Sequence, residues 1–202
     1  LQKLYAVGIP ASLNMALPSL LISSLNGILS AFSGTYVLVL GAYYKLQTFV
    51  FMPASGLTQG AMPIMGFSYG AGNGQRLHRT LAISLKVCFV IMAAGCLLFM
   101  AAPAWLLTLF DASEQMLAIG VPALRIISIS FLPATVGFIL PTMFQSMGRG
   151  GYSLVVFLLR QLVITLPAAW LLSGVFGLTG IWASFILAES VAAVVAVIFY
   201  RR

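Results

Sequence analysis

The sequence predicts an all-α membrane protein in which six transmembrane helices form one domain. Of its 202 residues, 61% are hydrophobic and 6% are charged, whereas about a quarter of the residues in soluble domains are charged. A water-soluble core of this size cannot bury so much apolar surface, so lipid is the solvent that suits most of the chain. The apolar residues also come in stretches of about 20 or more, the length that one helix needs to cross a bilayer. These stretches lack the period-two alternation of a membrane barrel.

Six apolar stretches meet this length requirement, and most of them end at a recognisable break. The first carries no charge and ends at the Ser-Gly-Thr of residues 33–35, and the second ends in a group of glycines. The third stops near Pro103, and the fourth is long enough to tilt or to kink. The predicted spans are approximately residues 8–32, 36–67, 80–102, 114–147, 152–172 and 178–200, and together they make residues 1–202 a single lobe.

The positions of the basic residues predict how this lobe is oriented. If every span crosses, six basic residues outside the spans fall on one side, whereas the opposite loops hold only Asp111 and Glu114. The six are Lys3, Arg76, Arg79, Arg149, Arg201 and Arg202. Basic residues mark the cytoplasmic side of membrane proteins, so both termini are expected in the cytoplasm. The formal net charge of +7 then reflects orientation in the membrane and does not call for a nucleic-acid partner.

A glycine-rich stretch, "GFSYGAGNGQRLHRT" at residues 66–80, interrupts the apolar chain. It follows a predicted helix and lacks the spacing of either phosphate-loop fingerprint. Glycine can take the left-handed conformation that ends helices, and basic residues anchor a helix end at the membrane surface. The stretch is therefore predicted to close the second span, with His78 as a solvated loop residue.

Prolines recur inside the spans, most densely in the fourth, which contains Pro122, Pro133 and Pro141. Each proline removes a backbone donor and tends to kink its helix. Such kinks serve either helix packing or a change between two packings, as a transporter requires. The sequence leaves both alternatives open.

Four ionisable residues fall well inside the spans, namely Lys45, Arg125, Arg160 and Glu189. Charges are costly in lipid, so these side chains should face protein or a wet cavity. Lys45, Arg125 and Glu189 share a predicted depth of roughly 13–17 Å below the outer ends of their helices, and Arg160 is placed lower. Glu189 is therefore expected to pair with Lys45 or Arg125. The pair either holds helices together or lines a cavity for ions or charged solutes.

Amide side chains add further candidates for a polar cavity. They are Asn14 in the first span, Gln47 in the second, Gln145 in the fourth and Gln161 in the fifth. Singly, each such residue more often makes an interhelical hydrogen bond. The stretch "YYKLQTFVF" at residues 43–51 combines aromatic rings, a cation and an amide, a combination that suits bulky amphipathic or cationic ligands. The alternative for this stretch is an aromatic belt at the membrane interface.

The composition argues against an enzyme or a metal site. No nucleophile, base and orienting group fall together in the sequence, and one histidine with two distant cysteines, Cys88 and Cys96, cannot form a metal-ligand cluster. We therefore expect neither catalytic residues nor a cofactor.

Three stretches resemble the MATE (multidrug and toxic compound extrusion) transporters. "YYKLQTFVFMPASGLTQGAMPIMGFSYGAGNGQR", residues 43–76, resembles their eighth helix and the loop after it. "LPTMFQSMGRGGYSLVVFLLRQLVITLPAAWLL", residues 140–172, resembles the region of their tenth and eleventh helices. "FGLTGIWASFILAES", residues 176–190, resembles the start of their last helix. The resemblance covers nearly the whole chain in order.

This resemblance implies a twelve-helix fold of two six-helix lobes, of which the chain is similar to the C-terminal lobe of the bacterial DinF/MepA-like branch. It implies secondary active export of drugs and organic cations in exchange for sodium or protons by alternating access, in the bacterial inner membrane. The implied partners are an N-terminal lobe, the bilayer and drug-like or cationic substrates. By similarity, Lys45, Gln47, Arg160, Gln161 and Glu189 become cavity candidates.

One departure from the family concerns the coupling ion. Some MATE proteins carry an acidic residue for the cation in the seventh or the tenth helix, but the corresponding stretches here contain no acid, including residues 131–145. The coupling carboxylate is then Glu189 or, as we favour, a residue of the other lobe. Two alternatives to drug export stay open: a lipid-linked saccharide flippase of the same superfamily, which needs a more cationic cavity, and a self-contained six-helix channel or structural protein.

Overall fold

The computed structural model describes residues 2–30 and 34–201 and, in the first helix, the side chains of Ser12 and of residues 16–30. The described elements are all helical. They are α1 (Gln2–Ser30), α2 (Gly34–Gly70), α3 (Gly74–Ala101), α4 (Pro103–Thr108), α5 (Glu114–Ser128), α6 (Phe131–Ser146), α7 (Gly150–Leu158), η1 (Leu159–Val163), α8 (Thr165–Phe176) and α9 (Leu178–Arg201).

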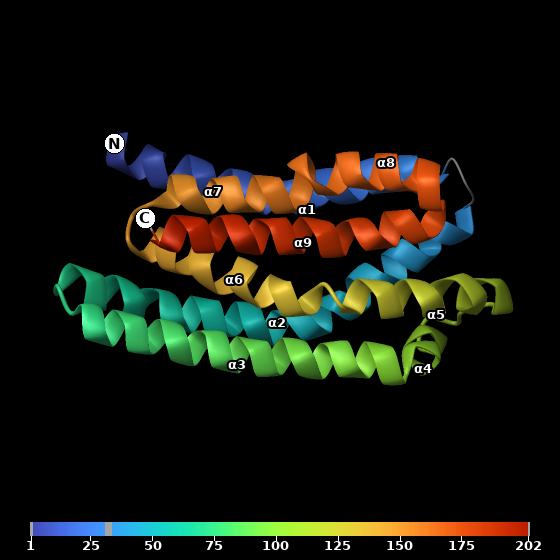
Figure 1. The fold of residues 1–202 in the computed structure, drawn as a ribbon, viewed down its shortest axis with the longest axis horizontal. Coiled ribbons are helices and arrows are strands. Elements are labelled where there is room, and N and C mark those ends of the chain that lie inside the picture. Colours follow the sequence, from blue (N-terminus) through green and yellow to red (C-terminus); the bar gives the residue numbers. More distant parts are fainter. Residues whose placement is uncertain (1, 31–33, 202) are drawn as a thin grey trace.

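The long helices lie side by side along one axis (Figure 1). Helix α2 packs on α3, α8 packs on α9, and α6 packs against both α3 and α9, which joins the two halves of the bundle. Helix α1 packs mainly on α7. The two chain termini, the α2–α3 turn and the α6–α7 connection lie at one end of the long axis, and α4 lies at the other (Figure 1).

Within the described ranges, four helical segments are long and apolar enough to cross a membrane: Gly34–Gly70, Gly74–Ala101, Gly150–Phe176 and Leu178–Arg201. The bent pair α5 and α6 makes a fifth crossing if it counts as one span. The part of α1 from Ala16 to Ser30 is a shorter apolar helix, so the sixth crossing remains a prediction.

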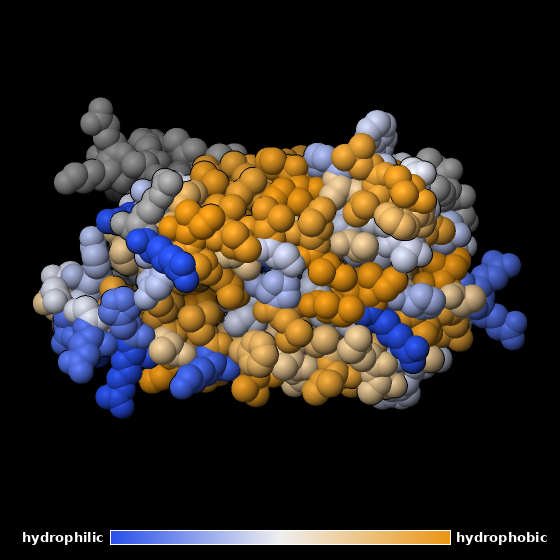
Figure 2. Space-filling view, in the orientation of Figure 1, coloured by the Kyte–Doolittle hydropathy of each residue, from blue (hydrophilic) through white to orange (hydrophobic). Residues whose placement is uncertain are grey.

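The outer surface of the bundle is apolar. Large hydrophobic side chains such as Phe49, Trp170 and Val175 are 75%, 69% and 75% exposed, and Figure 2 shows apolar residues over much of the visible face, with hydrophilic ones concentrated toward the two ends. Exposing so much apolar surface to water would be unfavourable in free energy, whereas the apolar lipid tails of a bilayer can surround it without that cost.

The turn between α2 and α3 forms as the glycines predict. Gly72 has a φ of 67°, in the left-handed region that glycine adopts most easily. The Asn73 side chain then caps α3 by accepting a hydrogen bond of 2.9 Å from the backbone N–H of Arg76. The prediction that His78 lies in a loop is wrong, because α3 begins at Gly74. The exposed His78 ring instead makes a 2.9 Å hydrogen bond with the hydroxyl of Tyr200 on α9.

The fourth predicted span is broken into α5 and α6, which meet at an angle of 49°. The break lies between Ser128 and Phe131, and Pro133 follows it in the first turn of α6. A proline has no N–H for the carbonyl four residues earlier, here that of Ile129, and its ring clashes with that carbonyl. The Ile129 carbonyl accepts the N–H of Leu132 instead. The helix therefore breaks just before Pro133, whereas Pro122 lies inside α5 and Pro141 lies inside α6.

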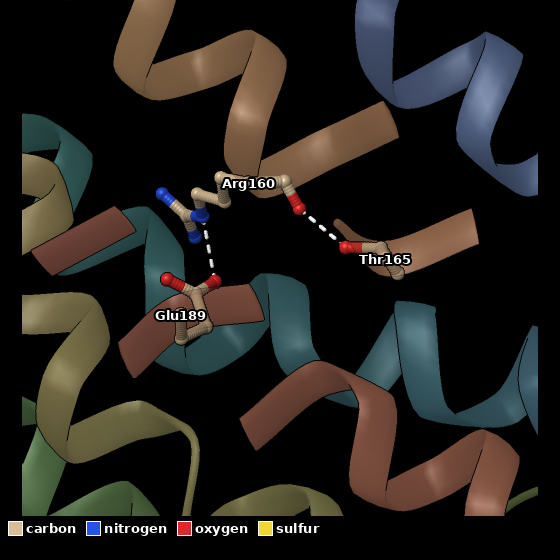
Figure 3. A network of polar contacts seen from close by, with 3 residues as sticks. All are labelled: Arg160, Thr165 and Glu189. Carbon is tan, nitrogen blue, oxygen red and sulfur yellow. Dashed lines mark hydrogen bonds and ion pairs between the residues drawn. The ribbon is translucent and has the colours of Figure 1, made fainter. Parts of the chain in front are cut away.

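The fifth span is also irregular. Between α7 and α8 the chain forms one π-helical turn, η1, in which the N–H of Ile164 reaches back to the carbonyl of Leu159. The β-branched residues Val163, Ile164 and Thr165 and the nearby Pro167 all weaken regular α-helix at this point. The Thr165 hydroxyl donates to the carbonyl of Arg160 (Figure 3). Such π turns are frequent at functional sites, and this one carries Arg160.

Candidate functional site

A cavity of about 660 Å³ lies within the bundle, inside the range of about 300–1,000 Å³ that ligand pockets occupy. Its wall is made by α1, α2, α6, α7, η1, α8 and α9. The lining residues are Pro18, Leu21, Ile22, Tyr44, Gln47, Thr48, Phe51, Met52, Ser55, Gln59, Phe138, Phe157, Arg160, Gln161, Thr165, Phe185, Ala188 and Glu189. Aromatic rings and a few polar groups therefore converge on one space.

The charged centre of this wall is an ion pair between Arg160 on η1 and Glu189 on α9. The Nε of Arg160 donates to Oε1 of Glu189 over 2.6 Å, and the two side chains are only 6% and 10% exposed. Figure 3 shows the pair lying between neighbouring helices. Burying two charges is costly, and a short, charge-assisted hydrogen bond offsets part of that cost.

This pairing corrects the prediction that Glu189 would contact Lys45 or Arg125. The prediction measured the depths of Arg160 and Glu189 from opposite ends of their helices. Counted from the end they share, Arg160 lies ten residues after Gly150 and Glu189 lies twelve residues before Arg201. At a rise of about 1.5 Å per residue these depths differ by only about 3 Å. The neighbours of Glu189 are then decided by helix packing, because α9 contacts η1 directly.

Aromatic rings surround the Arg160 guanidinium. Its central carbon lies 4.6 Å from the ring centre of Phe138 and 5.9 Å from that of Phe51, and the two rings pack edge to face 5.0 Å apart. A cation that is out of water gains from the negative face of an aromatic ring. Phe51 and Phe138 thus hold Arg160 at the cavity wall.

Four buried side-chain oxygen atoms have no hydrogen-bond partner among the described residues. They are the hydroxyls of Tyr43, Tyr44 and Thr135 and Oε2 of Glu189. Gly137 lies next to that carboxylate oxygen, since a Cβ at this position would be 3.5 Å from Oε2. Buried polar groups without partners are unfavourable, and Oε2 is the carboxylate oxygen of Glu189 that the described side chains leave without one.

Four of the eight predicted site residues line the cavity, namely Gln47, Arg160, Gln161 and Glu189. Lys45 lies outside it, with an exposed side chain whose Nζ is 5.7 Å from the ring centre of Phe110. Arg125 is exposed in the last turn of α5 and also lies outside the cavity lining.

The remaining two predicted residues are amides. Gln145 is absent from the cavity lining and joins α6 to α7, because its Nε2 donates to the Ser153 hydroxyl over 2.7 Å. That is the interhelical hydrogen bond which a single amide usually makes. Asn14 lies outside the residues whose side chains the structure describes.

The sequence does contain a signal that separates the lining residues of α2 from their neighbours. Tyr44, Gln47, Thr48 and Phe51 follow the spacing i, i+3, i+4, i+7 and so share one helix face. Lys45 stands about 100° away from Tyr44 on the same helix, off that face. No comparable pattern in the sequence marks Phe138 and Phe185 as cavity-lining residues, because phenylalanine is common throughout the chain.

The arrangement can bind a molecule, but it shows no catalytic chemistry. The cavity offers amides, hydroxyls, aromatic faces and one ion pair. Among the described residues, no group of three or more His, Cys, Asp or Glu side chains could hold a metal ion.

Comparisons of the sequence and of the structure with known proteins point to the same family. The sequence model of the MatE family matches residues 10–171. The multidrug export protein MepA of Staphylococcus haemolyticus is 26% identical over 196 residues, which are 97% of this chain and 43% of that protein. The chain thus spans less than half the length of this relative.

Solved structures agree with the sequence comparison. A crystal structure described as MATE in complex with MaL6 superposes with a TM-score of 0.91 and 25% identity, over 98% of this chain and 46% of that one. A MOP superfamily transporter from Pyrococcus furiosus Vc1 superposes with a TM-score of 0.91 and 26% identity, over 98% of this chain and 45% of that one.

Proposed function

Because this chain belongs to the MatE family, we propose that it forms one half of a multidrug exporter in the bacterial inner membrane and that its cavity contacts the exported compounds. The family and the apolar helices make the chain a multi-pass membrane protein, and relatives named as export proteins agree with the prediction that it is no enzyme. The observation that carries the proposal is the cavity of about 660 Å³, lined by four phenylalanines and a buried ion pair. Export by alternating access needs such a site inside the bundle.

The length of the relatives supports a second half. MepA of S. haemolyticus and the MATE structure are each more than twice as long as the part that this chain matches. We propose that a further six-helix lobe precedes these helices and completes the translocation path. We also propose that the end of the bundle carrying Arg76, Arg149 and Arg201 faces the cytoplasm, in line with the distribution of basic residues.

Coupling to sodium or protons belongs to the same proposal. One carboxylate oxygen of Glu189 already pairs with Arg160, and residues 131–145 contain no acid. We therefore place the coupling carboxylate in the other lobe, with Glu189 as the candidate within this chain.

Two other functions fit the structure less well. A lipid-linked saccharide flippase would need a cationic cavity, but Lys45 and Arg125 lie outside the cavity and the charge of Arg160 is balanced by Glu189. The description of one structural neighbour states that the reverse polarity of its binding pocket suggests a different function, so the charge of the cavity is a relevant criterion. A self-contained channel is less consistent with relatives of twice the length.

An efflux measurement tests the proposal. The complete protein, expressed in a bacterial strain that lacks its own multidrug exporters, should speed the energy-dependent loss of ethidium from preloaded cells relative to empty vector. Gln47→Leu removes an amide from the cavity wall and should slow this export. The matched variant Lys45→Ala changes the same helix two residues away, outside the cavity, and should affect export less.

Loss rates equal to the vector control, for ethidium and for several cationic and zwitterionic dyes, would overturn the proposal. If Lys45→Ala abolished export while Gln47→Leu did not, the site would lie elsewhere on α2.

A further inference from the structure

The guanidinium of Arg160 lines the cavity with most of its hydrogen-bonding capacity unused. A guanidinium carries five N–H donors, and Arg160 uses its Nε in the bond to Glu189. No hydrogen bond joins its Nη1 or Nη2 to any side chain that the structure describes, which in the first helix means Ser12 and residues 16–30. These nitrogens are also not among the fully enclosed unpartnered atoms of that part of the chain, and Arg160 lines the cavity wall.

The carboxylate of Glu189 is much less available to a ligand. Oε1 is occupied by Arg160, and Oε2 is enclosed beside Gly137. The other lining residues that the structure describes include no Asp, Glu or Lys. Among the described groups, the free charged donors at this wall are therefore the terminal nitrogens of Arg160.

The remaining wall suits an aromatic molecule. Phe51, Phe138, Phe157 and Phe185 line the cavity beside the amides of Gln47 and Gln161. A planar guanidinium can hold two carboxylates on two of its edges, one through Nε and one through the pair of terminal nitrogens. A ligand can thus engage Arg160 without displacing Glu189.

We propose that the cavity prefers compounds that join an aromatic body to a carboxylate or a similar acidic oxygen group, which binds at Nη1 and Nη2 of Arg160. A compound without the acidic group lacks this contact with the described part of the wall, so it binds more weakly than its acid-bearing counterpart. The inference rests on the proposed export function and narrows its substrate class.

A pair of dyes that differ in one group tests this preference. Rhodamine 110 carries a free carboxyl group, and rhodamine 123 is its methyl ester. Fluorescence polarisation with the purified complete protein in lipid nanodiscs gives the Kd of each dye. The acid should bind about tenfold tighter than the ester, since one charge-assisted contact contributes about 1.5 kcal/mol or more.

Two variants show whether Arg160 causes the difference. In the double variant Arg160→Gln/Glu189→Gln, no charge is left unpaired, and the ratio of the two Kd values should fall to about one. In Glu189→Gln the guanidinium stays and the competing acid is gone, so the ratio should stay the same or rise. Size-exclusion elution of both variants checks that they are folded.

The outcomes separate this inference from the export function. If both dyes bind and are exported equally well, the preference is wrong and the export function stands. If the ratio survives in the folded double variant, Arg160 is not the group that binds the acid. If neither dye binds the complete protein, both this inference and the use of the cavity for dyes of this kind are overturned.

Discussion

Arg160 and Glu189 show at the scale of single residues how packing makes buried charge tolerable. The guanidinium donates to the carboxylate over 2.6 Å and lies against Phe138 and Phe51. Both side chains sit on helices that contact each other within the bundle. Each charge is therefore acceptable in this position only because the other is present.

The ion pair predicts unequal effects of single and double substitutions. Arg160→Gln leaves the Glu189 carboxylate buried without its partner and should lower the free energy of unfolding by about 3–5 kcal/mol. The double variant Arg160→Gln/Glu189→Gln should recover most of this loss. Unfolding of the purified complete protein by increasing mole fractions of SDS, followed by circular dichroism, measures both. Equal losses in the two variants would show that the residues are not energetically coupled.

Two of the helical elements owe their shape to local sequence. The α5–α6 bend of 49° lies just before Pro133, and the π turn η1 lies just before Pro167. Proline withdraws a donor from the carbonyl four residues earlier, which accounts for the break before Pro133, whereas at η1 the missing donor of Pro167 adds to the β-branched residues Val163, Ile164 and Thr165 in weakening regular α-helix. The consequences of the two irregularities differ, because only η1 carries a charged residue of the cavity.

The hairpin between α8 and α9 offers a test at the scale of elements. The two helices pack closely, and a Cβ added at Gly180 would overlap the backbone carbonyl oxygen of Leu172. Gly180→Ala should therefore force the helices apart and cost about 1–3 kcal/mol. Gly174→Ala is the matched control, because a Cβ there meets nothing within 4 Å, and its effect should stay within about 0.5 kcal/mol.

The SDS titration used for the ion pair compares these two alanine variants. A Gly180→Ala protein as stable as the Gly174→Ala protein would contradict the close approach of α8 and α9.

The whole molecule is organised by the bilayer. Arg76, Arg79, Arg149 and Arg201 come together at one end because α2, α6 and α9 finish there and α3 and α7 start there (Figure 1). Asp111 lies in the loop between α4 and α5, and Glu114 is the first residue of α5, at the other end. This asymmetry is the basis for proposing that the arginine-bearing end faces the cytoplasm.

Cysteine labelling in intact cells tests that orientation. Gln75→Cys lies in the exposed first turn of α3, and Gln115→Cys lies in the exposed first turn of α5, at the opposite end. The native Cys88 and Cys96 are buried and should not react. A membrane-impermeant maleimide should label the complete protein with Gln115→Cys in intact cells, and label Gln75→Cys only after the cells are opened. The reverse pattern would invert the proposed topology.

The sequence by itself determined the solvent of this protein and much of its helix pattern. Composition and span length are sums over local residues, so they predict lipid-exposed helices without knowledge of their neighbours. The Gly72 turn and the kink before Pro133 follow from backbone sterics at single positions. The spacing of Tyr44, Gln47, Thr48 and Phe51 places them on one face of α2, but the sequence also predicts Lys45 as a cavity candidate, and the structure places it outside the lining.

The tertiary structure decided which of the candidate residues meet. Glu189 pairs with Arg160, which lies 29 residues earlier in the sequence. Lys45 and Arg125 are exposed instead. Gln145 donates a hydrogen bond to Ser153. The distance between two helices depends on how all of them pack, and no single stretch of sequence encodes it. The cavity, and the free edge of Arg160 within it, exist only because η1, α2, α6 and α9 converge there.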